Sequence, residues 1–139
     1  MKKYYISILW LLFTYFSYAQ TKGITYQAVL YDPQYLTQTL PGIDTGLIPY
    51  ANKSVCLKFE ITDISNQKTY VEVQSTTTDA FGMVNLIIGL GTRIGGNVSD
   101  FKLINWNKQV NGLIVSIAKG SNCSDFIEIS NQPFTATPF

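Results

Sequence analysis

The sequence predicts an all-β fold, a single antiparallel β-sandwich of about seven strands that follows a cleaved signal peptide. Short segments rich in Val, Ile, Tyr, Phe and Thr recur between turn signals along the chain. Helical periodicity is nearly absent, so the helices that a parallel α/β sheet needs between its strands are missing. After removal of a signal peptide the chain still has enough residues for one domain with one core.

Residues 1–19 are predicted to be a secretory signal peptide, and residues 20–139 the β-sandwich domain. Two lysines precede a predominantly apolar and aromatic run over Tyr4–Phe16, and the small residues Ser17 and Ala19 follow it. The run is shorter than the roughly 20 residues of a transmembrane helix. We therefore expect cleavage after Ala19, a secreted or cell-surface protein, and no stable membrane insertion.

The mature chain is expected to be almost neutral. The whole sequence has 10 basic and 9 acidic residues, and the signal peptide removes two of the lysines. Because the net charge is near zero, there is no electrostatic basis for binding nucleic acid.

The strands are bounded by turn residues and alternate between apolar and polar positions. The clearest alternation is in "SVCLKFEIT", where Val55, Leu57, Phe59 and Ile61 share one face, which places Glu60 on the opposite, solvent-facing side. In chain order, the predicted strands are Ile24–Tyr31, Ser54–Thr62, Thr69–Thr76, Met83–Gly89, Leu113–Lys119 and Asp125–Ser130. One helical turn is predicted within Val98–Trp106, with Ser99 as its cap.

Two glycine-containing turns are interpreted as structural. In "TDAFG", Asp79 can accept hydrogen bonds from the backbone that follows it, and Gly82 supplies a positive φ. Gly89 and Gly91 end the strand in "LIIGLGTRIGG", where a dinucleotide fingerprint would need a third glycine in place of Ile94 and a following helix. These glycines are therefore predicted to form a bulge or tight bend at a corner of the sandwich.

The residue inventory argues against catalysis. The chain has no histidine, which removes the Ser-His-Asp and Cys-His triads and the commonest transition-metal ligand. The acids near strand ends and on strands, Glu60, Asp63, Glu72 and Glu128, are interpreted as solvated surface groups, because no spacing marks a facing pair. We predict no catalytic, cofactor-binding or metal-binding residue.

The two cysteines, Cys56 and Cys123, leave two possibilities open. Export permits a disulfide between them. Cys56 is expected on the outer face of its strand and Cys123 in a turn, so the alternative is two separate thiols.

The segment Asp32–Pro49 has three prolines and two glycines and is predicted to be a long loop. Tyr35 in this loop and Tyr50 directly after it are candidate ligand-binding residues, since tyrosine rings can stack on sugars.

Three sequence motifs, "GITYQAVLYD", "YVEVQSTTTDAFGMVNLIIGLG" and "FKLINW", follow one another along the chain. The order resembles an N-terminal module of secreted and surface proteins of the Bacteroidota, and the likeness covers nearly all of the mature chain. In that family a Tyr-Gln-Ala strand comes first. A Tyr-x-Glu-x-(His or Gln) strand then leads through a Thr-Thr-(Asn or Asp)-x-Phe-Gly turn into a Leu-x-Ile-Gly-x-Gly strand end. The matching residues here are Tyr26, Gln27, Ala28, Tyr70, Glu72, Gln74, Asp79, Phe81, Gly82, Leu86, Gly89, Gly91, Ile104 and Trp106.

The resemblance implies an immunoglobulin-like or transthyretin-like sandwich, because the "TDAFG" turn is also similar to that of transthyretin-like and carboxypeptidase-regulatory domains. In the family such a module often precedes collagen-like or tail-fibre-type regions. This chain departs from the pattern in the long loop after Asp32.

We therefore expect a non-catalytic exported module with a structural, adhesive or assembly role at the cell surface, as the N-terminal part of a longer protein. Its expected partners are other surface proteins or glycans. Two alternatives stay open: a carbohydrate-binding module that uses the loop tyrosines, and an accessory domain of a secreted hydrolase.

Overall fold

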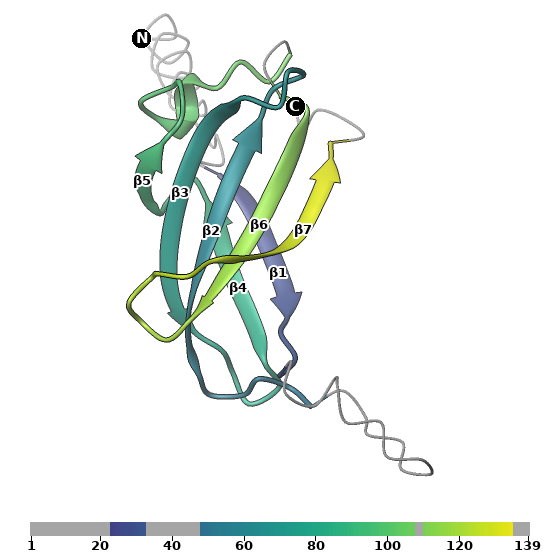
Figure 1. Cartoon of the computed structure of the whole chain (residues 1–139), viewed down its shortest axis with the longest axis vertical. Coiled ribbons are helices and arrows are strands. Elements are labelled where there is room, and N and C mark those ends of the chain that lie inside the picture. The colour runs from purple at the N-terminus through teal and green to yellow at the C-terminus, as the bar shows by residue number, and fades with distance from the viewer. Residues whose placement is uncertain (1–22, 33–47, 108–109, 135–139) are drawn as a thin grey trace, which may run out of the picture.

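The structure, a computed structural model, describes residues 23–32, 48–107 and 110–134, and it is all-β (Figure 1). The predicted signal peptide lies outside the described residues. Within the described part of the chain, no helix is long and apolar enough to cross a membrane.

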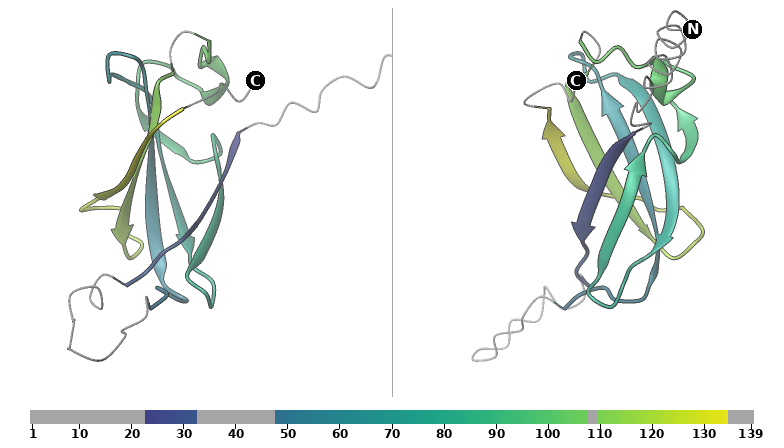
Figure 2. Two further views of the ribbon diagram at one scale, coloured as in Figure 1. Left: turned by 90° about the vertical axis from the view of Figure 1, so that its right-hand side faces the viewer. Right: turned by 180° about the vertical axis from the view of Figure 1, so that it is seen from behind.

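Within the described residues, seven antiparallel strands form two sheets, which confirms the predicted all-β sandwich. The smaller sheet pairs β1 (Ile24–Val29) with β4 (Met83–Ile88). Figure 2 shows this pair facing the larger sheet. The larger sheet has the order β5-β3-β2-β6-β7, with β5 at Thr92–Gly95, β3 at Lys68–Thr77, β2 at Ser54–Thr62, β6 at Gly112–Lys119 and β7 at Ile127–Pro133.

The core lies between the sheets and is built around β2. Its alternate residues Val55, Leu57, Phe59 and Ile61 are all fully buried, as the alternation predicts. Phe59 meets Tyr26 of β1 edge to face, with ring centroids 5.0 Å apart. Burying one side chain of this size stabilises the fold by about 1.5–3 kcal/mol relative to leaving it exposed. Because these side chains lie between the sheets and Phe59 contacts β1, β2 holds the two sheets together.

The prediction that Glu60 faces solvent is wrong. Glu60 does lie on the face opposite Phe59, but only 6% of its surface is exposed. The connection between β6 and β7 crosses this face, and the Lys58 ammonium lies 5.2 Å from the centroid of the Phe126 ring on that connection. Glu60 forms an ion pair with Lys68, in which the Nζ of Lys68 lies 2.6 Å from the Oε1 of Glu60. The periodicity of β2 reveals neither the connection that crosses its outer face nor the pairing of Glu60 with Lys68 on β3.

The predicted helical turn is shorter than expected and is capped by a different residue. It is a 3-10 helix, Phe101–Leu103, and the Oδ1 of Asp100 accepts a 2.9 Å hydrogen bond from the backbone N–H of Lys102. Ser99, the predicted cap, lies one position too early. Because aspartate and serine are about equally favourable N-caps, the sequence alone does not show which of Ser99 and Asp100 caps the turn.

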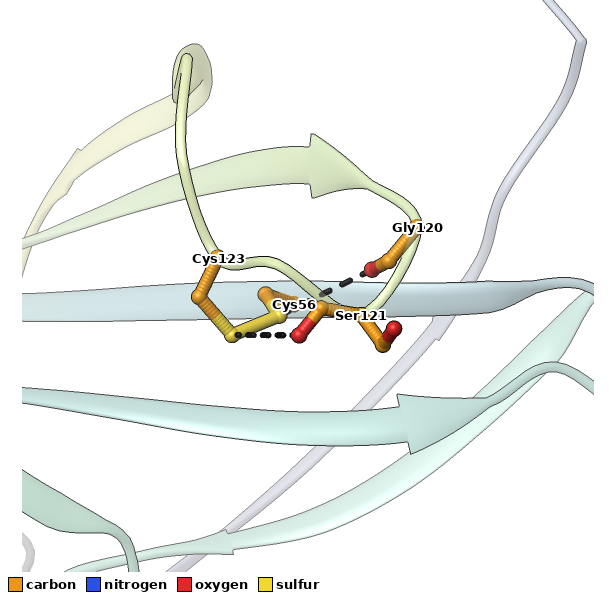
Figure 3. The surroundings of a disulfide bond; sticks show 4 residues. All are labelled: Cys56, Gly120, Ser121 and Cys123. Atoms are coloured by element: carbon orange, nitrogen blue, oxygen red, sulfur yellow. Dashed lines mark hydrogen bonds between the residues drawn. A yellow bond between two sulfur atoms is a disulfide. The ribbon is translucent and has the colours of Figure 1, made fainter.

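Cys56 and Cys123 form a disulfide with Cα atoms 5.2 Å apart (Figure 3). Cys56 belongs to β2 and is fully buried, whereas Cys123 belongs to the connection between β6 and β7. Cys123 adopts a left-handed φ of 50°. The bond therefore ties the crossing connection to the outer face of the larger sheet.

Removing this disulfide is expected to lower the free energy of unfolding. The bond joins residues separated by 67 positions, and in the chain-entropy model a loop of that length contributes about 4 kcal/mol. Urea unfolding of the Cys56→Ser, Cys123→Ser double variant, compared with the oxidised wild type, measures the loss. An unchanged urea midpoint would contradict the expectation.

Candidate functional site: an apolar groove at the open side of the sandwich

The glycine-rich turn after β4 binds an anion, and that anion is a side chain of the protein. The backbone N–H groups of Gly89 and Gly91 donate to the Oε2 of Glu72, at 2.9 and 3.3 Å. The same oxygen accepts a 2.9 Å hydrogen bond from the hydroxyl of Tyr70, and the Oε1 accepts a 2.7 Å bond from the Nε2 of Gln74. Because the carboxylate already occupies these donors, the turn has no place for an external phosphate.

The local geometry explains the glycines. Gly89 has a φ of 107°, a conformation that side chains rarely adopt. A Cβ on Gly91 would lie 2.6 Å from the Cγ of Gln74. Gln74 also donates a 2.8 Å bond to the carbonyl of Ile87, so β3 and β4, which belong to different sheets, are tied together at this corner. Gly89 and Gly91 thus have a structural role.

The hydroxyl of Tyr70 is held in its neutral form. Burial raises the pKa of Tyr70, and the hydrogen bond to Glu72 and the charge of Glu72 raise it further. The Tyr70 ring is buried and packs edge to face on Phe101 at 5.6 Å. Glu72 itself has no exposed surface, so the interpretation of this acid as a solvated group is wrong.

Asp79 and Gly82 form the other turn. The Oδ1 of Asp79 accepts hydrogen bonds from the backbone N–H groups of Phe81 and Met83, both at 2.8 Å. Gly82 has a φ of 76°, and a Cβ there would lie 2.6 Å from the carbonyl oxygen of Leu30. The turn also contacts the end of β1, because the carbonyl of Gly82 accepts a 2.8 Å hydrogen bond from the N–H of Leu30.

The candidate site is a groove of about 920 Å³ between β1 and the β6–β7 edge of the larger sheet. One wall is formed by the end of β1 and the residues that follow it, where Val29 and Tyr31 are 40% and 42% exposed. The other wall is β7, where Ile127 and Ile129 are 69% and 45% exposed. Figure 2 shows β1 and β7 on the same open side of the sandwich. Two strands do not cover a sheet of five strands, and apolar side chains therefore stay in contact with water.

Among the described residues that line the groove, Lys119 and Asp125 carry charge. The ammonium of Lys119 lies 5.6 Å from the centroid of the Tyr50 ring. Asp125 lies on the connection that the disulfide holds, with a left-handed φ of 57°. A mostly apolar lining with one charge of each sign is suited to contact with an uncharged surface of another molecule.

The predicted ligand residues divide between the groove and the undescribed part of the chain. Tyr50 lines the groove, whereas Tyr35 lies outside the described residues. Sequence reasoning missed Ile127, Ile129 and Lys119 as groove residues. The alternate isoleucines of β7 could have indicated an apolar face on this strand, since both of them line the groove. Only the placement of β1 shows that this face is not covered by the smaller sheet. Among the described residues, no three potential metal-ligating side chains cluster.

Comparisons with protein families, with curated proteins and with solved structures find no match to this chain.

Replacing Glu72 with Gln is expected to lower the free energy of unfolding by about 1–3 kcal/mol, because an amide N–H₂ would face donors that now meet an oxygen. Urea unfolding followed by Trp106 fluorescence measures the change. Glu128→Gln, a substitution of an exposed acid on β7, is the matched control. Equal effects of the two substitutions would refute the internal role of Glu72.

Stability is also expected to fall in alkaline solution. The folded state raises the pKa of Tyr70 above its ordinary value of 10.0, so the neutral hydroxyl contributes stability that is complete below that value. The contribution is lost as the pH rises above it, because ionisation then favours the unfolded chain. Tyr70→Phe should weaken this alkaline loss. Urea midpoints at about pH 8 and about pH 11 test it, and parallel losses in both proteins would contradict it.

Proposed function

We propose that this chain is a non-catalytic, exported β-sandwich module with a structural, adhesive or assembly role at the cell surface, and that the groove is its contact with a partner. The groove is the observation that carries the proposal. Its walls expose apolar side chains from two separate segments, Val29 and Tyr31 at and after the end of β1 and Ile127 and Ile129 on β7. Contiguous exposed apolar surface on a folded domain marks an interaction site.

The state of the buried acids supports a non-catalytic role. Glu72 is saturated with hydrogen bonds from the turn and from neighbouring side chains, and Glu60 is paired with Lys68. General acid–base work requires a carboxyl group that can reach a substrate. These two carboxyl groups instead hold strands together.

Two further observations support export to an oxidising compartment. The disulfide between Cys56 and Cys123 is of a kind that persists outside the cytosol. The N-terminal residues have the order of a secretory signal peptide, and the motif order resembles the surface module of the Bacteroidota.

The experiment expresses the full chain with its own N-terminal residues in a bacterial host and measures the fraction retained on the cell surface. Ile129→Arg, which places a charge in the groove, is expected to release the protein into the medium. Ile64→Arg is the matched control, because Ile64 is 77% exposed and is not a groove residue. Equal retention of the two variants, or hydrolysis of ester, peptide or glycoside substrates by the purified wild type, would overturn the proposal. Retention that free sugars abolish would instead favour the carbohydrate-binding alternative.

A further inference from the structure

One edge of β1 is free of the devices that usually protect an exposed strand, which are charge, proline, irregularity and short length. The sequence "ITYQAV" contains no charge and no proline, and the pairing of β1 with β4 shows no register shift. By contrast, β5 is four residues long and carries Arg93, and β7 carries Glu128 and Pro133. In the described part of the chain, β4 is the one strand hydrogen-bonded to β1, so the opposite edge of β1 is open to a further strand.

The hydrogen-bond pattern identifies the backbone groups on this open edge. The N–H of Leu30 donates to the carbonyl of Gly82 at 2.8 Å, on the β4 side. Successive residues of a strand direct their backbone groups to opposite edges. The N–H and C=O groups of Thr25, Gln27 and Val29 therefore point away from β4.

The open edge of β1 lies above the part of the larger sheet that the smaller sheet leaves uncovered. Tyr26 of β1 packs on Phe59 of β2, so β6 and β7 extend beyond β1 (Figure 2). Ile117 of β6 and its neighbours Ile127 and Ile129 of β7 line the groove at this place. A strand added to β1 lies about 4.8 Å from it and about 10 Å above the larger sheet. The inward side chains of such a strand would therefore enter the groove.

We propose that β1 binds an extended segment of a protein partner, which pairs antiparallel with the open edge and becomes a third strand of the smaller sheet. This inference rests on the proposed function, since it states how the partner occupies the groove. The partner contributes a single segment, because β6 and β7 already fill the space into which a second packed sheet would extend. The antiparallel direction follows the other strand pairs of the described residues, and antiparallel ladders are slightly more stable per residue.

The groove also defines the side chains that this segment needs. In an antiparallel pair, the residues whose N–H and C=O groups face β1 have their side chains on the same face as Gln27, which is the exposed face of the smaller sheet. The residues between them point inward, toward Ile117 and Ile127. These inward residues are expected to be apolar, because burying an unpaired polar group there is unfavourable. The segment is thus recognised by its backbone and by an apolar residue at every second position.

The experiment titrates two synthetic peptides into the purified protein, up to millimolar concentration, and follows binding by isothermal titration calorimetry. Both are uncharged, end-capped heptapeptides in which glutamine and valine alternate. The first is N-methylated on its valines, whose N–H groups point away from β1 in the proposed pairing, so it is expected to bind. The second is N-methylated on its glutamines, which removes the donors directed at β1. It is expected to bind at least about tenfold more weakly, because the reversed face would place glutamines in the groove.

Gln27→Pro tests the same contact from the side of the protein. Proline at this position removes an N–H on the open edge and leaves the hydrogen bonds to β4 in place. The dissociation constant of the first peptide is expected to rise about tenfold or more. Gln27→Ala is the matched control, since it removes the same side chain and retains the N–H, so its affinity should stay close to that of the wild type. Far-ultraviolet circular dichroism checks that both variants are folded, and the two peptides decide the question on the wild type alone if Gln27→Pro is not.

A wild type that does not bind the first peptide would overturn the inference. Equal binding of the two peptides would also overturn it, as would equal binding of the first peptide by Gln27→Pro and Gln27→Ala when both are folded. The surface-retention experiment separates this inference from the proposed function. If Ile129→Arg is released while Gln27→Pro is retained, the partner occupies the groove without pairing with β1, which rejects strand addition and keeps the proposed function.

Discussion

The carboxylate of Glu72 is the constraint on which the corner of this sandwich depends. Glu72 lies on β3 in the larger sheet, and it accepts hydrogen bonds from the turn that ends β4 in the smaller sheet. A buried carboxylate without partners is strongly unfavourable, so the charge requires the backbone N–H groups of Gly89 and Gly91, and their approach requires glycine. The Tyr-x-Glu-x-Gln strand and the Gly-x-Gly turn are therefore two halves of one structural device, with Tyr70 and Gln74 completing the set of donors.

The opposite side of the molecule shows what happens where the two sheets are not tied together. There the larger sheet extends to β7 while the smaller sheet ends at β1, and a groove lined by apolar side chains remains. The disulfide at Cys123 holds the connection that contributes Asp125 to the rim. The fold thus closes one side internally, with a charged network, and leaves an apolar groove on the other side.

The strands were predictable because burial on one face imposes a period of two, and in β2 that period fixes four core residues without ambiguity. β5 was missed because four residues are too few to show a period. The last strand begins at Ile127, later than the predicted Asp125, because the residues before it are held in a tight turn with positive φ at Cys123 and Asp125. Glu60 was misplaced because its ion-pair partner Lys68 lies on the neighbouring strand β3, and the periodicity of β2 gives no sign of that pairing. The groove was predicted only in part. Tyr50 was a candidate residue, but Ile127 and Ile129 on the other wall come from a segment far along the chain.

The sequence by itself determined the class of the fold, the inward face of its central strand and the absence of histidine chemistry, because each of these depends on residue identity and local spacing. The tertiary structure alone decided that the glycines of "LIIGLG" bind Glu72, that the two cysteines meet, and that β1 and β7 enclose an open groove. These features depend on which distant segments become neighbours. Sheet packing sets those neighbours, and local periodicity carries no information about them.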